Sequence, residues 1–509
     1  MLWRFRALTV CQVSLQPNRC CLFTTKMKKT LLASLLAMML AQPLLAYADL
    51  PALPDLGDVS DSTLSMADEA RLGRDFMRAM RDAGDVLDDA EVNDYINTLG
   101  HRLSASVRVP GLQLSYFVVN DKQINAFAMP GGYVGVNSGL VVATQSEGEL
   151  ASVIGHETAH VTQRHIARMQ AATSATSPLL LLGTVLAAVL ASRAGGSQAS
   201  IGTLSAGLGL QISNQLAFSR DFEREADRVG MQYLAQAGFD VRTMPAFFQR
   251  LESANRYSDN NAYAFLRTHP VTSQRISEAQ NRALEYPVKM RADSTAYLLV
   301  REKLRVMTLA PDEAVRFYQM MLDKGQYLNE GAMWYGLSRA QLAAHHLPAA
   351  RTALGKAEAR LPADPMLFGQ EAAIAREAGD WAGALASLRR GQQAFKDSQP
   401  LQMAELDVLI DSGNRPGALA LLRQLQSRYP RDAALYRSEA RLYADRDAQR
   451  YHAALGNAFY FERRYEAALE QYQFASQAKG DDFYLRSSIE ARMREVEKLL
   501  KEEKKDSGK

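Results

Sequence analysis

The sequence SEGELASVIGHETAHVTQRHIAR occupies residues 146–168 and decides how the chain is interpreted. Ser146 is followed three residues later by Glu149, which is the form of a capping box at the start of a helix. Apolar residues at helical spacing follow. We therefore expect an amphipathic helix that begins after Ser146 and runs to about Arg168.

Two histidines on this helix predict a metal site. His156 and His160 are four residues apart, so they lie on one face and both rings can reach one zinc ion. Glu157 is offset on the helix so that it can meet a water molecule bound to that ion. Zinc lowers the pKa of such a water, and a neighbouring carboxylate can take its proton. The pattern predicts peptide hydrolysis without a covalent intermediate, and a solvated helix face is the alternative interpretation.

A catalytic zinc site needs a third protein ligand and an open fourth position. The longer form of the motif would have Gly at 163 and His at 166, where this chain has Gln163 and Ile166. His165 lies five residues beyond His160, and on a continuous helix it points about 140° away from the metal. We expect His165 to be an exposed or packed side chain, and the third ligand to be a carboxylate.

The segment FEREAD at residues 222–227 supplies candidate carboxylates in a helical context that ends near Gly238. Glu223 and Asp227 share a face, whereas Glu225 lies about 200° around from Glu223. We favour Glu223 as the ligand over Glu225. Asp227 would then lie beside the site and could orient a ligand histidine. An ordinary charged helix face is the alternative.

Residues 155–165 and 223–227 together resemble the metallopeptidase family of the prenyl-protein-processing endopeptidases and bacterial membrane stress proteases. Further family patterns match at NAFA (125–128), PGG (130–132), THP (268–270) and RI (275–276), so the likeness covers about residues 65–285. The resemblance implies a gluzincin-type zinc metalloendopeptidase that binds one Zn²⁺ per chain. Its ligands would be His156, His160 and Glu223, with Glu157 as the base and Asp227 as a catalytic helper.

His269 precedes a proline, and such a residue is usually a loop residue that caps the next helix. The resemblance implies that it lies near the metal. There it would either stabilise a developing oxyanion or occupy the open coordination site as a reversible latch. The resemblance also implies that substrate lies extended along an edge strand of the sheet.

The residues before the motif predict two helices and a small sheet. Ser65 starts a helix to about Arg81, and Asp88 or Asp89 opens a second. Strands are expected at residues 112–119, 126–129 and 133–136, the last two joined by the turn at 130–132.

The second half of the chain is strongly helical and repetitive. Alanines and leucines each recur at intervals of 34 residues, at Ala350, Ala384, Ala418, Leu354, Leu388 and Leu422. This interval is typical of tetratricopeptide repeats, whose stacked helix pairs form a solenoid. Generic helical packing is the alternative. From about Lys498 onward we expect a charged, frayed tail.

The N-terminal residues predict export. Lys28 and Lys29 precede an apolar run that ends in Ala46-Tyr47-Ala48, the order of a signal peptide cleaved after Ala48. All three cysteines precede residue 27, so the predicted mature chain has neither a disulfide nor a cysteine metal site. Six of the 59 basic residues and none of the 56 acidic ones lie in residues 1–48. The remainder is slightly acidic, which gives no footprint for nucleic acid.

A long apolar, glycine-bearing segment at residues 179–212 separates the two metal-site stretches. Its apolar runs are too short to span a bilayer. It is either a buried hairpin of helices, or a lid or surface that makes a peripheral membrane contact or meets unfolded clients.

We therefore predict an α+β, mostly α fold: a zincin-like metallopeptidase domain with a small β-sheet, followed by an α-solenoid of tetratricopeptide repeats. The expected divisions are a signal peptide and upstream extension (1–48), a linker (49–64), the peptidase domain (65–290), the solenoid (291–497) and a charged tail (498–509).

The expected function is that of an exported zinc endopeptidase that receives clients through its solenoid. The resemblance implies a periplasmic location, unfolded or misassembled outer-membrane proteins as substrates, and the outer-membrane β-barrel assembly machinery as the partner of the repeats. The alternative is a non-proteolytic chaperone or adaptor whose metal site is latched or structural.

Overall fold

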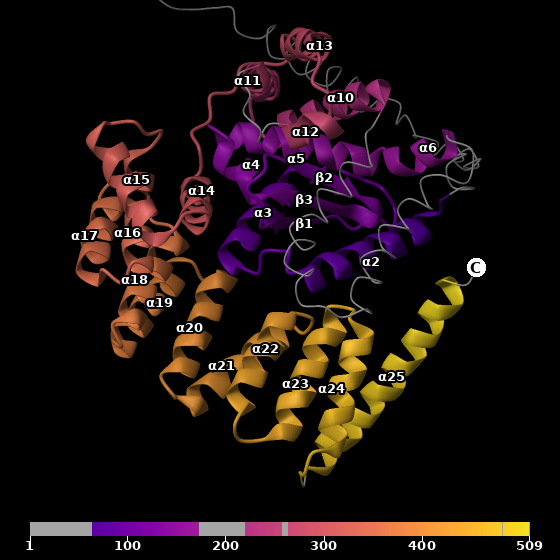
Figure 1. Ribbon diagram of the computed structural model, residues 1–509, viewed down its shortest axis with the longest axis vertical. Coiled ribbons are helices and arrows are strands. Elements are labelled where there is room, and N and C mark those ends of the chain that lie inside the picture. Colours follow the sequence, from indigo (N-terminus) through magenta and orange to yellow (C-terminus); the bar gives the residue numbers. More distant parts are fainter. Residues whose placement is uncertain (1–63, 173–218, 257–262, 481, 508–509) are drawn as a thin grey trace, which may run out of the picture. The chain divides into compact units, whose positions relative to one another are not determined.

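The computed structural model describes residues 64–172, 219–256, 263–480 and 482–507. The predicted α+β, mostly α fold is confirmed, with one small sheet and a long run of paired helices (Figure 1). The expected signal peptide and the apolar segment 179–212 lie outside the described residues. Within the described part of the chain, no helix combines the length and apolar character needed to cross a membrane.

The predicted helices before the sheet are confirmed. They are α2 (Met66–Ala83) and α3 (Ala90–Leu103). Ser65 and Asp89 cap them by accepting hydrogen bonds from the backbone amides of Asp68 and Val92.

The sheet has three strands in the order β1-β3-β2. These are β1 (Ser115–Val119), β2 (Ala126–Met129) and β3 (Tyr133–Asn137), with β1 parallel and β2 antiparallel to β3. The predicted turn is η2 (Pro130–Gly132), in which Gly131 and Gly132 have φ of 75° and 95°. A Cβ on Gly132 would lie 2.0 Å from the carbonyl oxygen of Gln113, so only glycine fits there.

The motif helix is α5 (Glu147–Thr162), and it packs against β2, β3 and α3. All of its residues except Val161 are buried, so the motif is not a solvated helix face. The expected extension to Arg168 is wrong. The helix ends after Thr162 because Arg164 adopts φ of 52°, and a separate helix, α6 (His165–Ala172), follows.

The second motif stretch lies on α10 (Arg220–Gln236), which packs on α5 at backbone contact distance. A Cβ on Gly230 would lie 3.1 Å from the Cα of His156, and a Cβ on Gly155 would lie 3.3 Å from the Gly230 carbonyl oxygen. These two glycines therefore let the helices approach closely enough for the side chains of α10 to reach the histidines of α5.

Further helices lie among the described residues of this part of the chain. They are α4 (Ser138–Ala143), α11 (Thr243–Arg256), α12 (Tyr263–Thr268) and α13 (Ser273–Ala283).

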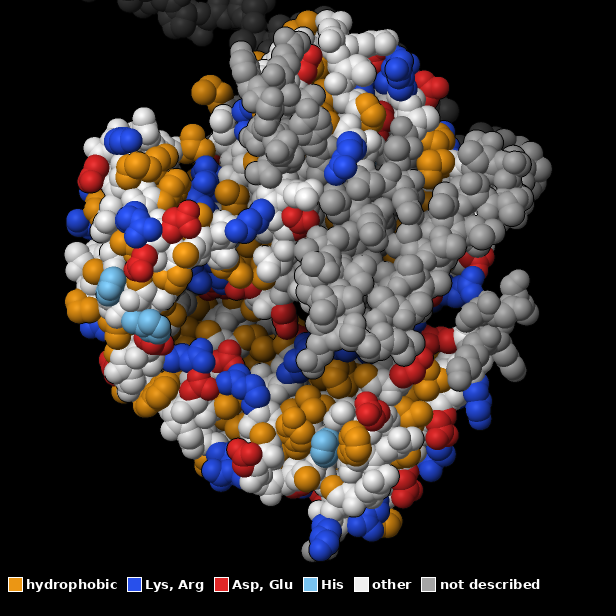
Figure 2. Space-filling model, in the orientation of Figure 1, with side chains coloured by type: hydrophobic (Ala, Val, Ile, Leu, Met, Phe, Trp, Pro, Cys, Tyr) orange, Lys and Arg blue, Asp and Glu red, His pale blue; other side chains and the backbone are white. Residues whose placement is uncertain are grey.

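The second half is a series of antiparallel helix pairs, as the 34-residue interval predicts (Figure 1). The helices are α14 (Thr295–Met307), α15 (Pro311–Asp323), α16 (Glu330–Ala343), α17 (Leu347–Glu358), α18 (Pro365–Glu377), α19 (Trp381–Ala394), α20 (Gln399–Asp411), α21 (Arg415–Arg428), α22 (Ala433–Tyr443), α23 (Ala448–Phe461), α24 (Tyr465–Gln477) and α25 (Phe483–Ser507). The recurring alanines and leucines are all buried. Acidic and basic side chains intermingle over the visible face of these helices (Figure 2).

The expected frayed tail is wrong, because α25 continues through Lys498 to Ser507. Val496 is fully buried, and Leu499 and Leu500 pack against the cluster that contains Tyr472. Apolar residues at helical spacing therefore hold this charged segment on α24.

Small residues set the spacing between the helices of the solenoid. A Cβ on Gly336 of α16 would lie 2.3 Å from the ring of Tyr318 on α15. That ring cannot easily move aside, because its hydroxyl donates to the carboxylate of Glu302 at 2.8 Å. We expect Gly336→Ala to destabilise the solenoid by about 1–3 kcal/mol through overpacking.

Gly355→Ala is the matched control, because Gly355 is a helical glycine of α17 with no atom within 4 Å of an added Cβ. It should instead stabilise by about 0.5–1 kcal/mol through helix propensity. Denaturant unfolding followed by circular dichroism measures both, and equal effects would contradict the packing argument.

Candidate metal centre

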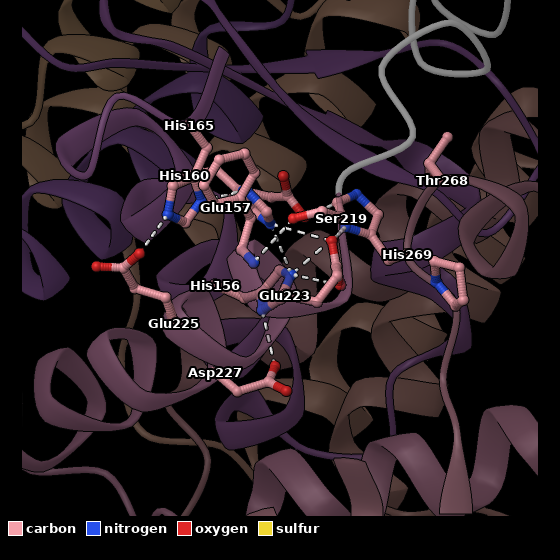
Figure 3. A network of polar contacts seen from close by, with 12 residues as sticks. His156, Glu157, His160, His165, Ser219, Glu223, Glu225, Asp227, Thr268 and His269 are labelled. Carbon is pink, nitrogen blue, oxygen red and sulfur yellow. Dashed lines mark hydrogen bonds and ion pairs between the residues drawn. The ribbon is translucent and has the colours of Figure 1, made fainter. Parts of the chain in front are cut away.

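Three helical segments bring four candidate ligands to one point. His156 and His160 project from α5, Glu223 from the first turn of α10, and His269 follows α12 (Figure 3). All four side chains are buried, and one ligand atom from each lies within 4.8 Å of the others. Among the described residues, these four form the group of His and carboxylate side chains whose atoms lie close enough together to hold one metal ion.

The spacing of these atoms suits a four-coordinate ion. The Nε2 atoms of His156 and His160 are 3.0 Å apart, and His156 Nε2 is 3.4 Å from His269 Nδ1. Glu223 Oε1 lies 3.4 Å from His160 Nε2 and 3.0 Å from His269 Nδ1. Bonds of about 2.0–2.1 Å in a tetrahedron place neighbouring ligand atoms about 3.3 Å apart. Nitrogen and carboxylate donors at this spacing therefore fit a metal ion.

Asp227 lies behind the first histidine, as its place on the helix face predicts. Its Oδ1 is 3.0 Å from His156 Nδ1, on the side of the ring away from the cluster (Figure 3). Arg275 of α13 donates to both Asp227 oxygens at 2.8 Å, and its Nη1 is 2.6 Å from Glu223 Oε2. One buried guanidinium thus pairs with both carboxylates of α10.

These neighbours set the charge of the site. Burial opposes protonation of His156, but hydrogen bonds to Asp227 and Glu223 outweigh it and raise the His156 pKa to about 10. Burial lowers the pKa of His160 well below its usual value. Burial alone would raise the pKa of Glu223, but His269 and Arg275 beside it hold that pKa well below its usual range. Glu223 is therefore a carboxylate ready to accept a cation.

Glu157 lies in a different environment from Glu223. Its carboxylate is fully buried, and its Oε1 is 3.4 Å from His269 Nε2. Burial raises the pKa of Glu157, although His269 and His156 partly offset this. A carboxylate with a raised pKa suits proton transfer near neutral pH.

His165 is packed and lies outside the group of candidate ligands, as expected, but the expected direction away from the metal face is wrong. His165 is fully buried, and its Nδ1 lies 2.9 Å from Nδ1 of His160. The expectation assumed a continuous helix, and the break at Arg164 turns His165 back toward the second histidine. No residue in the spacing itself signals that break, because arginine rarely adopts a positive φ.

The remaining candidate, Glu225, lies outside the cluster. Its Oε2 contacts His165 Nε2 at 3.3 Å and Arg168 Nη1 at 2.9 Å. The choice of Glu223 over Glu225 therefore agrees with the geometry. Arg275 belongs to the site through its contacts with Asp227 and Glu223, a role that the sequence pattern did not predict. The family match at residues 275–276 was the one indication that this residue matters.

Comparison with known proteins places this geometry in context. The sequence pattern of peptidase family M48 matches residues 90–283. A putative beta-barrel assembly-enhancing protease of Vibrio cholerae is 42% identical over 265 residues, which cover 52% of this chain and 54% of that protein. The chain thus aligns with about half the length of that relative.

Two further relatives align over more of their length. The beta-barrel assembly-enhancing protease of Yersinia pestis is 34% identical over 411 residues, covering 79% of this chain and 83% of that protein. That of Escherichia coli is 33% identical over 335 residues, covering 65% of this chain and 68% of that protein.

We expect Glu223→Gln to weaken metal binding, because it removes an anionic ligand. Loss of a residue that only orients a ligand costs about 10–100-fold in metal affinity, and the loss in Glu223→Gln should be larger. Asp221→Asn is the control, since Asp221 lies on the same helix with its side chain 89% exposed. Metal content after gel filtration and titration against a competing chelator measure both. Equal metal content in the two variants would contradict the assignment of Glu223.

Proposed function

Because the chain belongs to the β-barrel assembly-enhancing proteases of peptidase family M48, we propose that it is an exported zinc endopeptidase that cleaves misfolded or stalled outer-membrane proteins. The family assignment makes the chain a metallopeptidase. The proposal adds the identity of the metal, the roles of the site residues, the substrate and the location.

One observation carries the enzymatic part of the proposal. Four buried ligand atoms lie within 4.8 Å of one another, and the carboxylate of Glu157 contacts one of these residues, His269. A structural site needs only ligands, whereas a hydrolytic site also needs a base beside them. Zinc is the proposed ion because it accepts imidazole and carboxylate donors in tetrahedral geometry.

The protein groups divide the work of hydrolysis among them. His156, His160 and Glu223 would hold the ion, and a bound ion would supply a Lewis acid that polarises a peptide carbonyl and acidifies water. Glu157 accepts a proton from the attacking water at its carboxylate and delivers a proton to the leaving amine. Asp227 Oδ1, 3.0 Å from His156 Nδ1, would accept the proton of that nitrogen and so leave Nε2 of the ring directed toward the cluster.

His269 is proposed to be a reversible latch. Its Nδ1 lies among the ligand atoms, 3.4 Å from His156 Nε2 and 3.0 Å from Glu223 Oε1. A nitrogen at that place would fill the position that substrate and water need. Phe265 stacks on the His269 ring with centroids 4.8 Å apart, so the end of α12 supports the closed arrangement.

The solenoid and the location complete the proposal. Paired helices stacked at a 34-residue interval offer an extended surface for a protein partner, and we assign the β-barrel assembly machinery to it from the names of the relatives. The signal-like order of residues 28–48 supports a periplasmic location. Client binding by the solenoid would also allow chaperone-like assistance without cleavage.

Glu157→Gln tests the enzymatic role. The variant should retain its metal but lose about 10²–10⁴-fold in the rate of casein or unfolded outer-membrane protein cleavage, because the base is gone and the ligands remain. Glu278→Gln, on a partly exposed side chain of α13, is the control. Full complementation of a deletion strain by Glu157→Gln would favour the chaperone or adaptor alternative.

His269→Ala tests the latch. If the latch closes about nine molecules in ten, its removal should raise the proteolytic rate about tenfold. His345→Ala is the control, since the His345 side chain is 77% exposed on the solenoid. A collapse of activity in His269→Ala would instead assign His269 to stabilisation of the oxyanion.

A further inference from the structure

The two histidines of the motif have different neighbours at their outward nitrogens. Nδ1 of His156 faces the carboxylate of Asp227, which is the common arrangement behind a metal ligand. Nδ1 of His160 faces another imidazole, that of His165, at 2.9 Å. The function proposed above leaves His165 without a role.

The contact between the two rings requires a fixed proton arrangement. Two imidazole nitrogens at 2.9 Å form a hydrogen bond only if one donates and the other accepts. The other nitrogen of His165, Nε2, faces Glu225 Oε2 at 3.3 Å, and a carboxylate only accepts. His165 Nε2 therefore carries a proton, and in the neutral ring His165 Nδ1 is then the acceptor that faces Nδ1 of His160.

This arrangement determines which nitrogen of His160 is free for the metal. With the proton on Nδ1, the lone pair of His160 lies on Nε2, 3.0 Å from His156 Nε2 and 3.4 Å from Glu223 Oε1. The opposite tautomer would point an N–H at the cluster and exclude a cation.

The backbone is shaped to bring His165 to this position. Arg164 adopts φ of 52°, a left-handed conformation that is unfavourable for a residue other than glycine. Its side chain is anchored to the Leu64 carbonyl at 2.7 Å and to Glu69 at 3.2 Å. The strained turn is thus held by contacts outside the helix.

The ring of His165 is also held from the side of α10. Phe222, the residue before the candidate ligand Glu223, stacks on it with centroids 4.6 Å apart and an angle of 16°. The Arg168 guanidinium lies over the ring of Phe222, 4.8 Å from its centroid. Its Nη1 also pairs with Glu225 Oε2 at 2.9 Å. The orientation of His165 therefore depends on both metal helices.

We propose that His165, oriented by Glu225, is a positioning residue that keeps a proton on Nδ1 of His160 and leaves Nε2 free to bind the metal ion. This role rests on the proposed metal site but goes beyond it. It gives the second ligand histidine an orienting pair, Glu225–His165, equivalent to Asp227 behind the first.

Two substitutions at His165 separate hydrogen bonding from packing. Asn places an amide oxygen near the site of Nδ1 and still accepts from His160, whereas Phe keeps the stack on Phe222 but accepts nothing. We expect His165→Phe to weaken Zn²⁺ binding about 10–100-fold in competition with a chelator, and His165→Asn to recover most of the loss. His101→Phe, an exposed histidine of α3, is the control.

The tautomer itself is measured in the metal-free full-length protein. Long-range ¹H–¹⁵N correlation spectra of ¹⁵N-histidine-labelled protein report which ring nitrogen carries the proton. The signals of His160 are those that disappear in His160→Gln, and we expect them to show a proton on Nδ1. Glu225→Leu, at a partly exposed position, should shift His160 toward the other tautomer and weaken Zn²⁺ binding. This variant keeps the test open if His165→Phe fails to fold.

Three results would overturn the proposal. These are an Nε2-protonated His160 in the metal-free wild type, wild-type Zn²⁺ affinity in both His165→Phe and Glu225→Leu, or equal losses in His165→Phe and His165→Asn. Failure of the peptidase proposal is distinguishable, because it would appear as absent Zn²⁺ binding or absent cleavage in the wild-type protein.

Discussion

The backbone contact between α5 and α10 is the constraint on which the site depends. Gly155 and Gly230 face each other across the two helices, where an added Cβ would lie only 3.3 Å or 3.1 Å from the opposite backbone. A helix pair at ordinary side-chain distance would hold Glu223 too far from His156 for both to bind one ion. The glycines therefore convert two stretches far apart in the sequence into one cluster.

The buried carboxylates at this helix contact need partners that offset their loss of solvation. Glu157, Glu223 and Asp227 are all buried, and isolated buried carboxylates would be strongly unfavourable. Arg275 pairs with two of them, while Glu157 is left with a raised pKa. The same distribution of charge gives the three carboxylates the different environments on which their proposed roles as ligand, orienting group and base rest.

Each motif histidine has a polar neighbour at its outward nitrogen, on the side away from the candidate metal position. Asp227 holds His156 directly, and Glu225 reaches His160 through His165. Both routes begin on α10, so this helix carries the proposed third ligand and also contacts the outward sides of the two histidines. A site whose alignment comes from one packed helix responds as a unit to any movement of that helix.

The residue pattern alone predicted the motif helix, the placement of Glu223 and Asp227 on one face with Glu225 on another, and the 34-residue repeat, because these follow from helical periodicity. Local periodicity could not reveal the break at Arg164 or the course of α25 past Lys498. The break depends on anchors at Leu64 and Glu69, and the end of α25 depends on apolar contacts with α24. Arg275 likewise became part of the site only when α13 packed beside α10. Tertiary packing decided these features because their energies come from partners that are distant along the chain.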